Sequence, residues 1–287
     1  MKRKYKIADI NIELILPFSY GDLKEYKSYW TDDEKTDITI EFKYGSYEIP
    51  KTEDSMEEEY NRITQTKEGQ IFELIGADIE SIYGCMVLPK GEKHRFTCYL
   101  NEKARENLPH ATQVFKAISL EYLLNCYHTY ILHASYIHWK GMGILFSGPS
   151  GSGKSTQARL WQTYEEAEII NGDRVAVRKD GMHIKGYGLP YAGSSGVFKN
   201  ITTNLGAIVI VRHGKENKMK ELSKAQAFRY LFEETIVHTW DKEYQERITD
   251  ALIETVNQVP VYFLECKPER EAVNMVKGKL EKEYAIS

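Results

Sequence analysis

The feature that most constrains the fold is a glycine-rich loop between an apolar run and an amphipathic one. The loop is Gly148-Pro149-Ser150-Gly151-Ser152-Gly153-Lys154-Ser155, which fits the pattern GxxxxGK[ST] of a P-loop. The apolar run 144–146 before the loop is typical of a buried strand, and the spacing after it predicts a helix over 155–162. A strand, a tight loop and a helix in this order predict an α/β fold.

Each residue type in this loop has a chemical task. Glycines allow consecutive backbone N–H groups to turn inward around a phosphate chain, which a Cβ atom would obstruct. Lys154 places a positive charge on the β- and γ-phosphates, and the Ser155 hydroxyl is positioned to bind Mg²⁺. The helix that begins near Lys154 directs its positive end at the same phosphates. We therefore expect a nucleotide to bind at residues 148–155 together with Thr156.

The loop alone does not identify the class of nucleotide-binding protein. A GTPase would carry an NKxD motif, which is absent, and an ABC-type ATPase would carry LSGGQ, of which residues 222–226 lack both glycines. A usual companion of the loop is an apolar strand that ends in an acid. Here residues 207–211 are followed by Arg212, whereas residues 261–264 are followed by Glu265, one candidate for that acid.

A second candidate acid lies in the segment 168–175. Asp173 follows Ser155 by 18 residues, at the end of a short predicted strand. An acid at that place can accept the proton of an attacking hydroxyl or hold the water of a bound metal. The preceding pair Asn171-Gly172 is equally typical of a hairpin turn with Asp173 at its corner. Spacing alone leaves both interpretations open.

The rest of the chain divides into two parts. Residues 1–105 contain short runs of alternating apolar and polar residues, which predict a β-rich region with strands near 5–14, 37–44, 70–74, 86–88 and 95–100. The acidic stretch 51–60 is expected to be a solvated loop or helix face. Residues 106–287 mix both element types. Helices are expected at 109–127, 225–236, 242–256 and 268–282, and strands at 130–137, 141–146, 169–170, 175–177, 183–185, 206–211 and 261–265. We place the boundary near 103–112.

Composition excludes several classes of protein. A net charge of −4 argues against a general nucleic-acid binder. No run approaches the ~18 apolar residues of a membrane span, and Asp9 and Glu13 interrupt the apolar stretch that a signal peptide would need. No two cysteines form a CxxC pair, so neither a disulfide framework nor a zinc site is expected; the four are Cys85, Cys98, Cys126 and Cys266. The sequence therefore predicts a cytoplasmic protein with reduced thiols.

Several motifs occur in a fixed order between residues 130 and 215. They are Leu132-His133-Ala134-Ser135, then 143–148 into the loop, then Asn171-Gly172-Asp173-Arg174-Val175, then Gly186-Tyr187-Gly188-Leu189-Pro190. In order and spacing this region resembles the HPr kinase/phosphorylase family, which shares its nucleotide core with the ATP-dependent phosphoenolpyruvate carboxykinases. It looks most like the HPr-kinase-like proteins that carry Pro-Tyr-x-Gly-Ser-Ser, here at 190–195, followed by Lys199-Asn200. Residues 1–105 do not resemble the usual N-terminal domain of the metabolic HPr kinases.

The resemblance implies an α/β kinase core of mixed sheet and helices, preceded by the β-rich region. Its implied activity is transfer of the γ-phosphate of ATP, with Mg²⁺, to a serine-type hydroxyl of a protein or peptide. By position, Lys154 and Ser155 would hold phosphate and magnesium, and Asp173 would be the general base and a metal ligand. His133 matches the active-site histidine of the family. Because HPr kinases assemble as hexamers, the resemblance also makes a homo-oligomer one expectation.

This sequence departs from the family at several positions. The first acid of the family's acid pair is Gly172 here, and its metal-binding glutamate aligns with His183. The late arginine loop has no clear counterpart, so reverse phosphorolysis is in doubt. Two alternatives follow: a non-catalytic or weakly hydrolytic ATP-binding regulatory or maturation partner, and a kinase of a small hydroxylated metabolite.

Three further features have two interpretations each. The loop 193–196 is either a polar loop that closes over the reacting phosphate or a plain surface loop. Lys199 and Arg174 either supply charge to the transition state or are surface cations.

Overall fold

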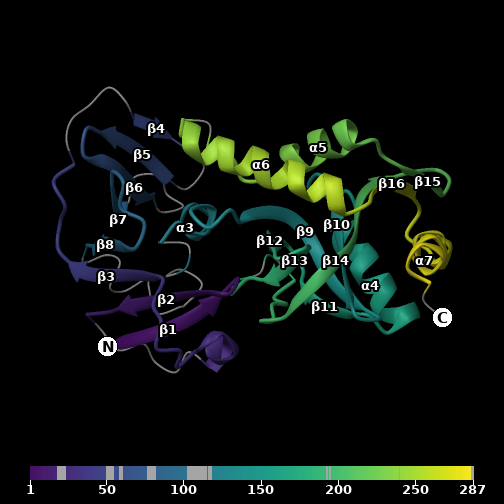
Figure 1. The fold of residues 1–287 in the computed structure, drawn as a ribbon, viewed down its shortest axis with the longest axis horizontal. Helices are drawn as coiled ribbons and strands as arrows, with labels where there is room; N and C mark the ends of the chain where they lie inside the picture. Colours follow the sequence, from purple (N-terminus) through teal and green to yellow (C-terminus); the bar gives the residue numbers. More distant parts are fainter. Residues whose placement is uncertain are drawn as a thin grey trace. The chain divides into compact units, whose positions relative to one another are not determined.

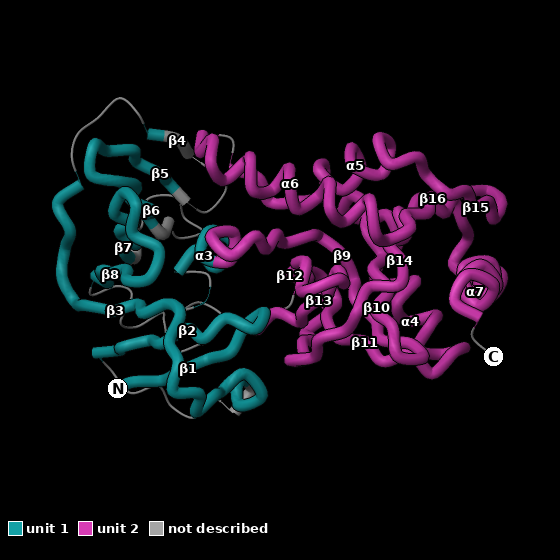
Figure 2. The backbone as a smooth tube through the Cα atoms, viewed as in Figure 1, with its two compact units in different colours: residues 1–123 teal, residues 124–287 magenta. Residues whose placement is uncertain are grey.

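The computed structural model describes residues 1–17, 24–49, 55–57, 61–75, 82–101, 115, 118–191, 193, 195–238 and 240–285. The chain forms two compact units, residues 1–123 and 124–287, which Figure 2 colours separately. Each unit contains its own sheet. The boundary expected near 103–112 falls on residues outside the described part of the chain.

The first unit is a mixed sheet with the strand order β1-β2-β3-β8-β7-β6-β5-β4 (Figure 1). Its strands are β1 (Lys2–Ile7), β2 (Ile10–Ile15), β3 (Ile38–Tyr44), β4 (Ser55–Glu57), β5 (Asn61–Thr66), β6 (Gly69–Ile75), β7 (Ile82–Pro89) and β8 (Arg95–Leu100), with the 3-10 helix η1 (Lys24–Tyr29). β3 is parallel to both β2 and β8, and the other neighbours are antiparallel. This unit is therefore β-rich, as the alternation predicted.

The single strand expected over 5–14 is in fact a hairpin of β1 and β2. Ala8 and Asp9 form its turn with φ values of 49° and 59°. The buried side chains change from odd positions, Tyr5 and Ile7, to even positions from Ile10 onward. This change from odd to even positions is the sequence signal of the turn. Ile7 and Ile10 are paired across the two turn residues, so odd positions in β1 and even positions in β2 lie on the same face of the sheet.

Two other expectations fall partly on residues that are not described. Of the helix expected over 109–127, the structure describes Phe115 and residues 118–127, and among the latter only α3 (Leu120–Asn125) is helical, preceded by Ser119 in the left-handed conformation at φ 43°. Of the acidic stretch 51–60, it describes only β4.

The second unit is a mixed sheet with the order β10-β9-β12-β13-β14-β16-β15, in which β11 also pairs with β9 and β10 with β14. Its strands are β9 (Tyr130–Trp139), β10 (Met142–Ser147), β11 (Glu168–Asn171), β12 (Arg174–Asp180), β13 (His183–Gly188), β14 (Thr202–His213), β15 (Lys218–Glu221) and β16 (Val261–Cys266). Its helices are α4 (Lys154–Glu165), α5 (Lys224–Glu233), α6 (Lys242–Gln258) and α7 (Arg270–Tyr284). The expected α/β class with a mixed sheet is confirmed. Among the described residues, no helix combines the length and the apolar character needed to span a bilayer.

Three strands of this sheet, β10, β14 and β16, run parallel, so their carboxyl ends meet at one edge. The P-loop follows β10 at that edge. β15 was not expected from the sequence because it is a mostly exposed strand that carries no apolar run.

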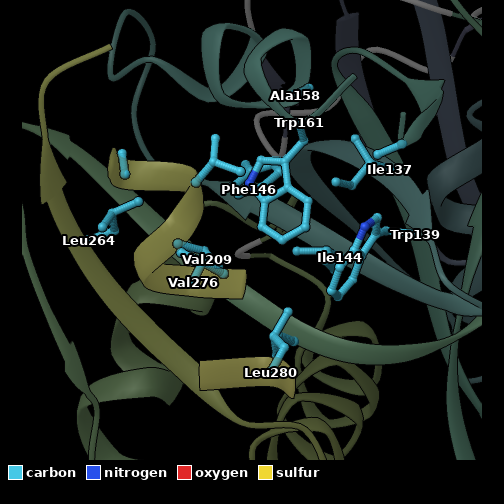
Figure 3. Packing of buried hydrophobic residues seen from close by; sticks show 14 of the residues in the cluster. Ile137, Trp139, Ile144, Phe146, Ala158, Trp161, Val209, Leu264, Val276 and Leu280 are labelled. Atoms are coloured by element: carbon cyan, nitrogen blue, oxygen red, sulfur yellow. The ribbon is translucent and has the colours of Figure 1, made fainter. Parts of the chain in front are cut away.

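A buried cluster fixes the helix that follows the P-loop (Figure 3). Trp161 of α4 is fully buried, and its ring meets that of Trp139 edge-on at 5.1 Å between centroids. Phe146, one residue before the end of β10, lies 6.1 Å from the same indole. The cluster also takes in residues of β14, β16 and α7. The strand and the helix on either side of the loop are therefore packed against one another.

We expect Trp161→Ala to lower the free energy of unfolding of this unit by about 3–5 kcal/mol, because it leaves a large cavity under α4. Urea unfolding monitored by circular dichroism measures the change. Tyr164→Ala is the matched control, since Tyr164 lies on the same helix with 39% of its surface exposed. Equal losses in both variants would contradict the role given to this cluster.

Candidate functional site

The P-loop has the geometry that its glycines predict. Gly148, Gly151 and Gly153 have φ values of 139°, 76° and 102°, which L side chains rarely adopt. Gly148 is also confined: an added Cβ would lie 2.7 Å from Nη1 of Arg212 and 2.8 Å from the carbonyl oxygen of Val211. The loop is therefore held closely against the carboxyl end of β14.

The end of β14 supports the loop at a second point. His213 follows Arg212, and its Nε2 lies 2.6 Å from the carbonyl oxygen of Gly151, an acceptor. In the sequence, Arg212 is recognisable only as the residue that follows the apolar run 207–211, and His213 belongs to no motif. Their contact with the loop depends on the pairing of β14 with β10, which a local pattern does not contain.

Lys154 is buried at the base of the loop, with 7% of its surface exposed. Its ammonium donates to the carbonyl oxygens of Gly148, at 2.7 Å, and of Pro149, at 3.0 Å. Burial lowers the pKa of Lys154, whereas the negative charges of Glu234 and Asp173 act to raise it. A buried ammonium whose acceptors here are neutral carbonyls fits a phosphate group, which would give it an anionic partner.

Two carboxylates flank the ring of His133. Its Nε2 lies 3.4 Å from Oδ1 of Asp173, and its Nδ1 lies 3.5 Å from Oε2 of Glu234. The structure thus brings the expected His133 and Asp173 together and adds Glu234, which the sequence analysis did not identify.

The backbone explains why these residues meet. His133 on β9 pairs with Arg174 on β12, and Ala134 N–H donates to the carbonyl oxygen of Asp173 at 2.9 Å. His133 N–H donates to the carbonyl oxygen of Glu234 at 2.9 Å, so the end of α5 is attached to the same strand. Because β9 receives partners from both sides, His133 is fixed between two segments that are distant in sequence.

The Asn171-Gly172 pair forms a turn, but not that of a hairpin. β11 and β12 both pair with β9 rather than with each other. The buried Asn171 accepts hydrogen bonds at Oδ1 from the N–H groups of Asp173, at 2.9 Å, and Arg174, at 3.1 Å. This turn crosses between two regions of β9 and places Asp173 beside His133.

Asp173 is held in its ionised form. The hydrogen bond from His133 is the main cause that lowers its pKa below the ordinary value, and it outweighs the opposing effect of burial. Arg174, whose Nε lies 3.5 Å from Oδ2 of Asp173, and Lys154 lower the pKa further. Arg174 is therefore a neighbour of the candidate base.

Ser155 lies at the start of α4, opposite the turn. Its hydroxyl is 3.4 Å from the carbonyl oxygen of Gly172, to which Ser135 donates at 2.9 Å. Among the described residues, no group of three or more histidines, cysteines or acids is arranged to hold a metal ion. Mg²⁺ needs fewer protein ligands, since substrate phosphates and water supply most of its coordination. A hydroxyl such as that of Ser155, next to the backbone of the turn that carries Asp173, fits this pattern.

The space beside Gly172 is occupied by another side chain. An added Cβ on Gly172 would lie 2.0 Å from the hydroxyl of Ser195. Gly193 lies close to Asp173 in the same way, since a Cβ added to Gly193 would lie 2.7 Å from Cγ of Asp173. The described part of the 193–197 segment therefore lies against the turn and its acid; Ala192 and Ser194 are outside the described residues.

We expect Gly172→Asp to destabilise the protein by about 1–3 kcal/mol, because the new side chain collides with Ser195. Adding Ser195→Gly should recover most of this loss, which urea unfolding would measure. Gly278→Asp is a control without such a collision, since nothing lies within 4 Å of its Cβ position. A single variant as stable as the unaltered protein would contradict the close packing of this turn.

A cavity of about 290 Å³ opens along α4 beside Ser155 and Gly172. Its lining residues are Ser135, Ser155, Ala158, Arg159, Gln162, Ile169, Gly172, Ser195, Val197 and Lys199. Lys199 at its border forms an ion pair with Glu168, at 2.7 Å. The cavity thus reaches from the expected magnesium ligand to the basic side chain of Arg159.

The surroundings of two further candidate residues, His183 and Glu265, are as follows. His183 is exposed at the start of β13, in register with Asp180. Glu265 lies on β16 in register with Arg212, and a Cβ on Gly214 would lie 3.0 Å from its Oε1.

Comparison with known proteins adds little to this geometry. No protein-family model and no curated protein matches the sequence. Among solved structures, the chain is similar to the Hpr(Ser) kinase/phosphatase from Coxiella burnetii, with a TM-score of 0.31 and 12% identity, over 54% of this chain and 94% of that chain. A similarity at this level carries no functional weight. The function must rest on the residues of the site itself.

Proposed function

We propose that this protein is a phosphotransferase that moves the γ-phosphate of ATP to a serine-type hydroxyl of a protein or peptide, with Mg²⁺. The observation that supports this most is the presence, in one site, of the buried Lys154 at the base of the P-loop and of Asp173, whose Oδ1 lies 3.4 Å from Nε2 of His133. A cation for the phosphate and a base for the hydroxyl are the two side chains that such a transfer needs most.

The loop residues 148–156 bind the phosphate chain in this proposal. Their inward N–H groups contact its oxygens, and Lys154 turns from the loop carbonyls toward the β- and γ-phosphates. Ser155 and the carboxylate of Asp173 would hold Mg²⁺, which would supply further positive charge to the phosphates.

Asp173 removes the proton of the acceptor hydroxyl. As the acceptor oxygen forms its bond to the γ-phosphorus, the bond from that phosphorus to the oxygen of ADP breaks, and the proton moves to the carboxylate of Asp173. His133 and Arg174 keep this carboxylate ionised and directed before the transfer. Lys154 stabilises the charge on the phosphoryl group as it passes.

The test is to follow the γ-phosphate. Purified protein is incubated with Mg-ATP and a concentrated extract of its own host, and the reaction is observed by phosphorus NMR, with Lys154→Ala as the blank. A new phosphomonoester signal that is absent from the blank supports the kinase. Inorganic phosphate alone indicates an ATPase, and bound ATP that is not consumed indicates a non-catalytic partner.

The cavity favours a second candidate, a kinase of a small hydroxylated metabolite. A volume of about 290 Å³ is close to the smallest small-molecule sites, which begin at about 300 Å³. Size fractionation of the extract before the NMR experiment distinguishes the two acceptors, because a metabolite passes a filter that retains proteins.

A further inference from the structure

We propose that Glu234 is a positioning residue: it holds the Nδ1 side of the His133 ring so that Nε2 faces Asp173. Its effect on catalysis rests on the proposed phosphotransferase function, whereas its effect on the ring does not. This assigns a role to an acid that lies about a hundred residues from its partner in sequence and belongs to no motif of the sequence analysis.

The first argument is the burial of the Glu234 carboxylate. Its side chain is 11% exposed, whereas that of the adjacent Glu233 is 53% exposed and lies near Arg229 on the surface. Taking a carboxylate out of water is costly unless it is paired. The ring nitrogen of His133, at 3.5 Å, is such a partner.

The second argument is that the backbone fixes the two side chains in relation to each other. Leu132 and Thr235 form a β-bridge, and the N–H of Ile236 donates to the carbonyl oxygen of Ile131 at 3.3 Å. Together with the hydrogen bond from His133 N–H to the carbonyl oxygen of Glu234, these bonds attach the end of α5 to β9. The carboxylate of Glu234 therefore has a fixed approach to the ring.

The third argument is the arrangement of the ring. An imidazolium ring carries an N–H at each nitrogen, so one ring can donate to a carboxylate on either side, and the hydrogen bond at one nitrogen orients the other. Here Nδ1 faces Glu234 and Nε2 faces Asp173. With Glu234 in place the ring cannot rotate away from Asp173 without leaving a buried carboxylate unpaired. Where a carboxylate orients a metal-binding histidine through its second nitrogen, replacing that carboxylate lowers metal affinity or activity about 10–100-fold.

The charge of Glu234 also acts on Lys154, where it is the largest of the effects that raise the pKa of the ammonium. Removing this negative charge makes the surroundings of the phosphate chain more positive. We therefore expect ATP binding to stay equal or become tighter when Glu234 is replaced. A loss of turnover without a rise in KM for ATP separates positioning from general damage to the site.

The kinetic test compares Glu234→Ala, Glu234→Gln and the control Glu233→Ala. We expect Glu234→Ala to lower kcat about 10–100-fold, with no rise in KM for ATP. Glu234→Gln, which keeps an oxygen acceptor, should recover part of the loss, and Glu233→Ala should not change either constant. In a chain that carries His133→Gln, adding Glu234→Ala should cost nothing further. Independent, additive losses would overturn the proposal.

An NMR measurement tests the same contact without activity. In nitrogen-15-labelled protein at one pH, we expect an Nδ1–H signal of the His133 ring that is protected from exchange, assigned to His133 by its loss in His133→Gln and to Nδ1 by correlations within the ring. The signal should disappear in Glu234→Ala and persist in Glu233→Ala. Persistence in folded Glu234→Ala would overturn the proposal. Absence of phosphoryl transfer by the unaltered protein would refute the proposed function while leaving this result interpretable.

Discussion

Asp173→Asn should reduce phosphoryl transfer by about 10²–10⁴-fold, the usual contribution of a general base, and leave ATP binding intact. Asparagine has nearly the same shape but accepts no proton from the acceptor hydroxyl. It also removes a negative charge near Lys154, so the affinity for ATP should not fall. Turnover measured with the acceptor found in the extract, together with calorimetric titration of ATP, would separate the two effects.

The control for this variant is Asp180→Asn, which removes an exposed carboxylate paired with Lys185 at 2.6 Å. It should change neither turnover nor binding. If Asp173→Asn retained full turnover, the base would have to be another group.

The pKa of Asp173 also predicts how this loss depends on pH. Since His133 holds that pKa below the ordinary value, the carboxyl is ionised throughout the neutral range. The ratio of turnover between the unaltered protein and Asp173→Asn should therefore be the same at about pH 6 and pH 8. The lowered pKa also stabilises the fold above the ordinary pKa of a free aspartate, and this contribution is lost as the pH falls through the lowered value.

Lys154→Ala should lower kcat/KM by about 10³-fold or more, because one cationic donor is removed from both the bound phosphates and the transferring group. The same substitution removes an ammonium that burial disfavours and whose hydrogen bonds go to neutral carbonyls. We therefore expect the ligand-free variant to be no less stable than the unaltered protein, in contrast to Trp161→Ala. Transfer assays and urea unfolding check the two parts of this prediction.

Lys179→Ala is the matched control, since Lys179 forms an exposed ion pair with Glu254 at 2.9 Å and should affect neither measurement by much. A Lys154→Ala variant that lost stability along with activity would indicate a structural role for the ammonium. A variant that kept its activity would exclude the loop as the phosphate site.

The parts of the fold that depend on local patterns could be predicted from the sequence. The strand, the glycine loop and the helix around Lys154 occur as expected, because turn geometry and apolar spacing are properties of consecutive residues. The hairpin of β1 and β2 was missed although its signal was present, in the shift of buried positions across Ala8 and Asp9. The polar edge strand β15 gave no such signal.

The candidate site was predictable only in part, because local patterns do not contain contacts between segments that are distant in sequence. His133 and Asp173 were identified through motif order, and the structure brings them within ion-pair distance. Glu234 could not be found, because its contact arises from hydrogen bonds between the end of α5 and β9. The collision at Gly172 was also hidden, since Ser195 reaches that point only through the folding of the 193–197 segment.

The packing of Ser195 against Gly172 has a consequence for how this sequence can evolve. An acid at position 172 and a side chain at position 195 compete for the same space. The order in which the two positions are substituted therefore decides whether the intermediate protein is destabilised. A lineage that first shortens residue 195 can then accept an acid at 172, whereas the reverse order passes through a less stable intermediate. Related chains that carry two acids in this turn should therefore have a smaller residue, or a displaced segment, at the position of Ser195.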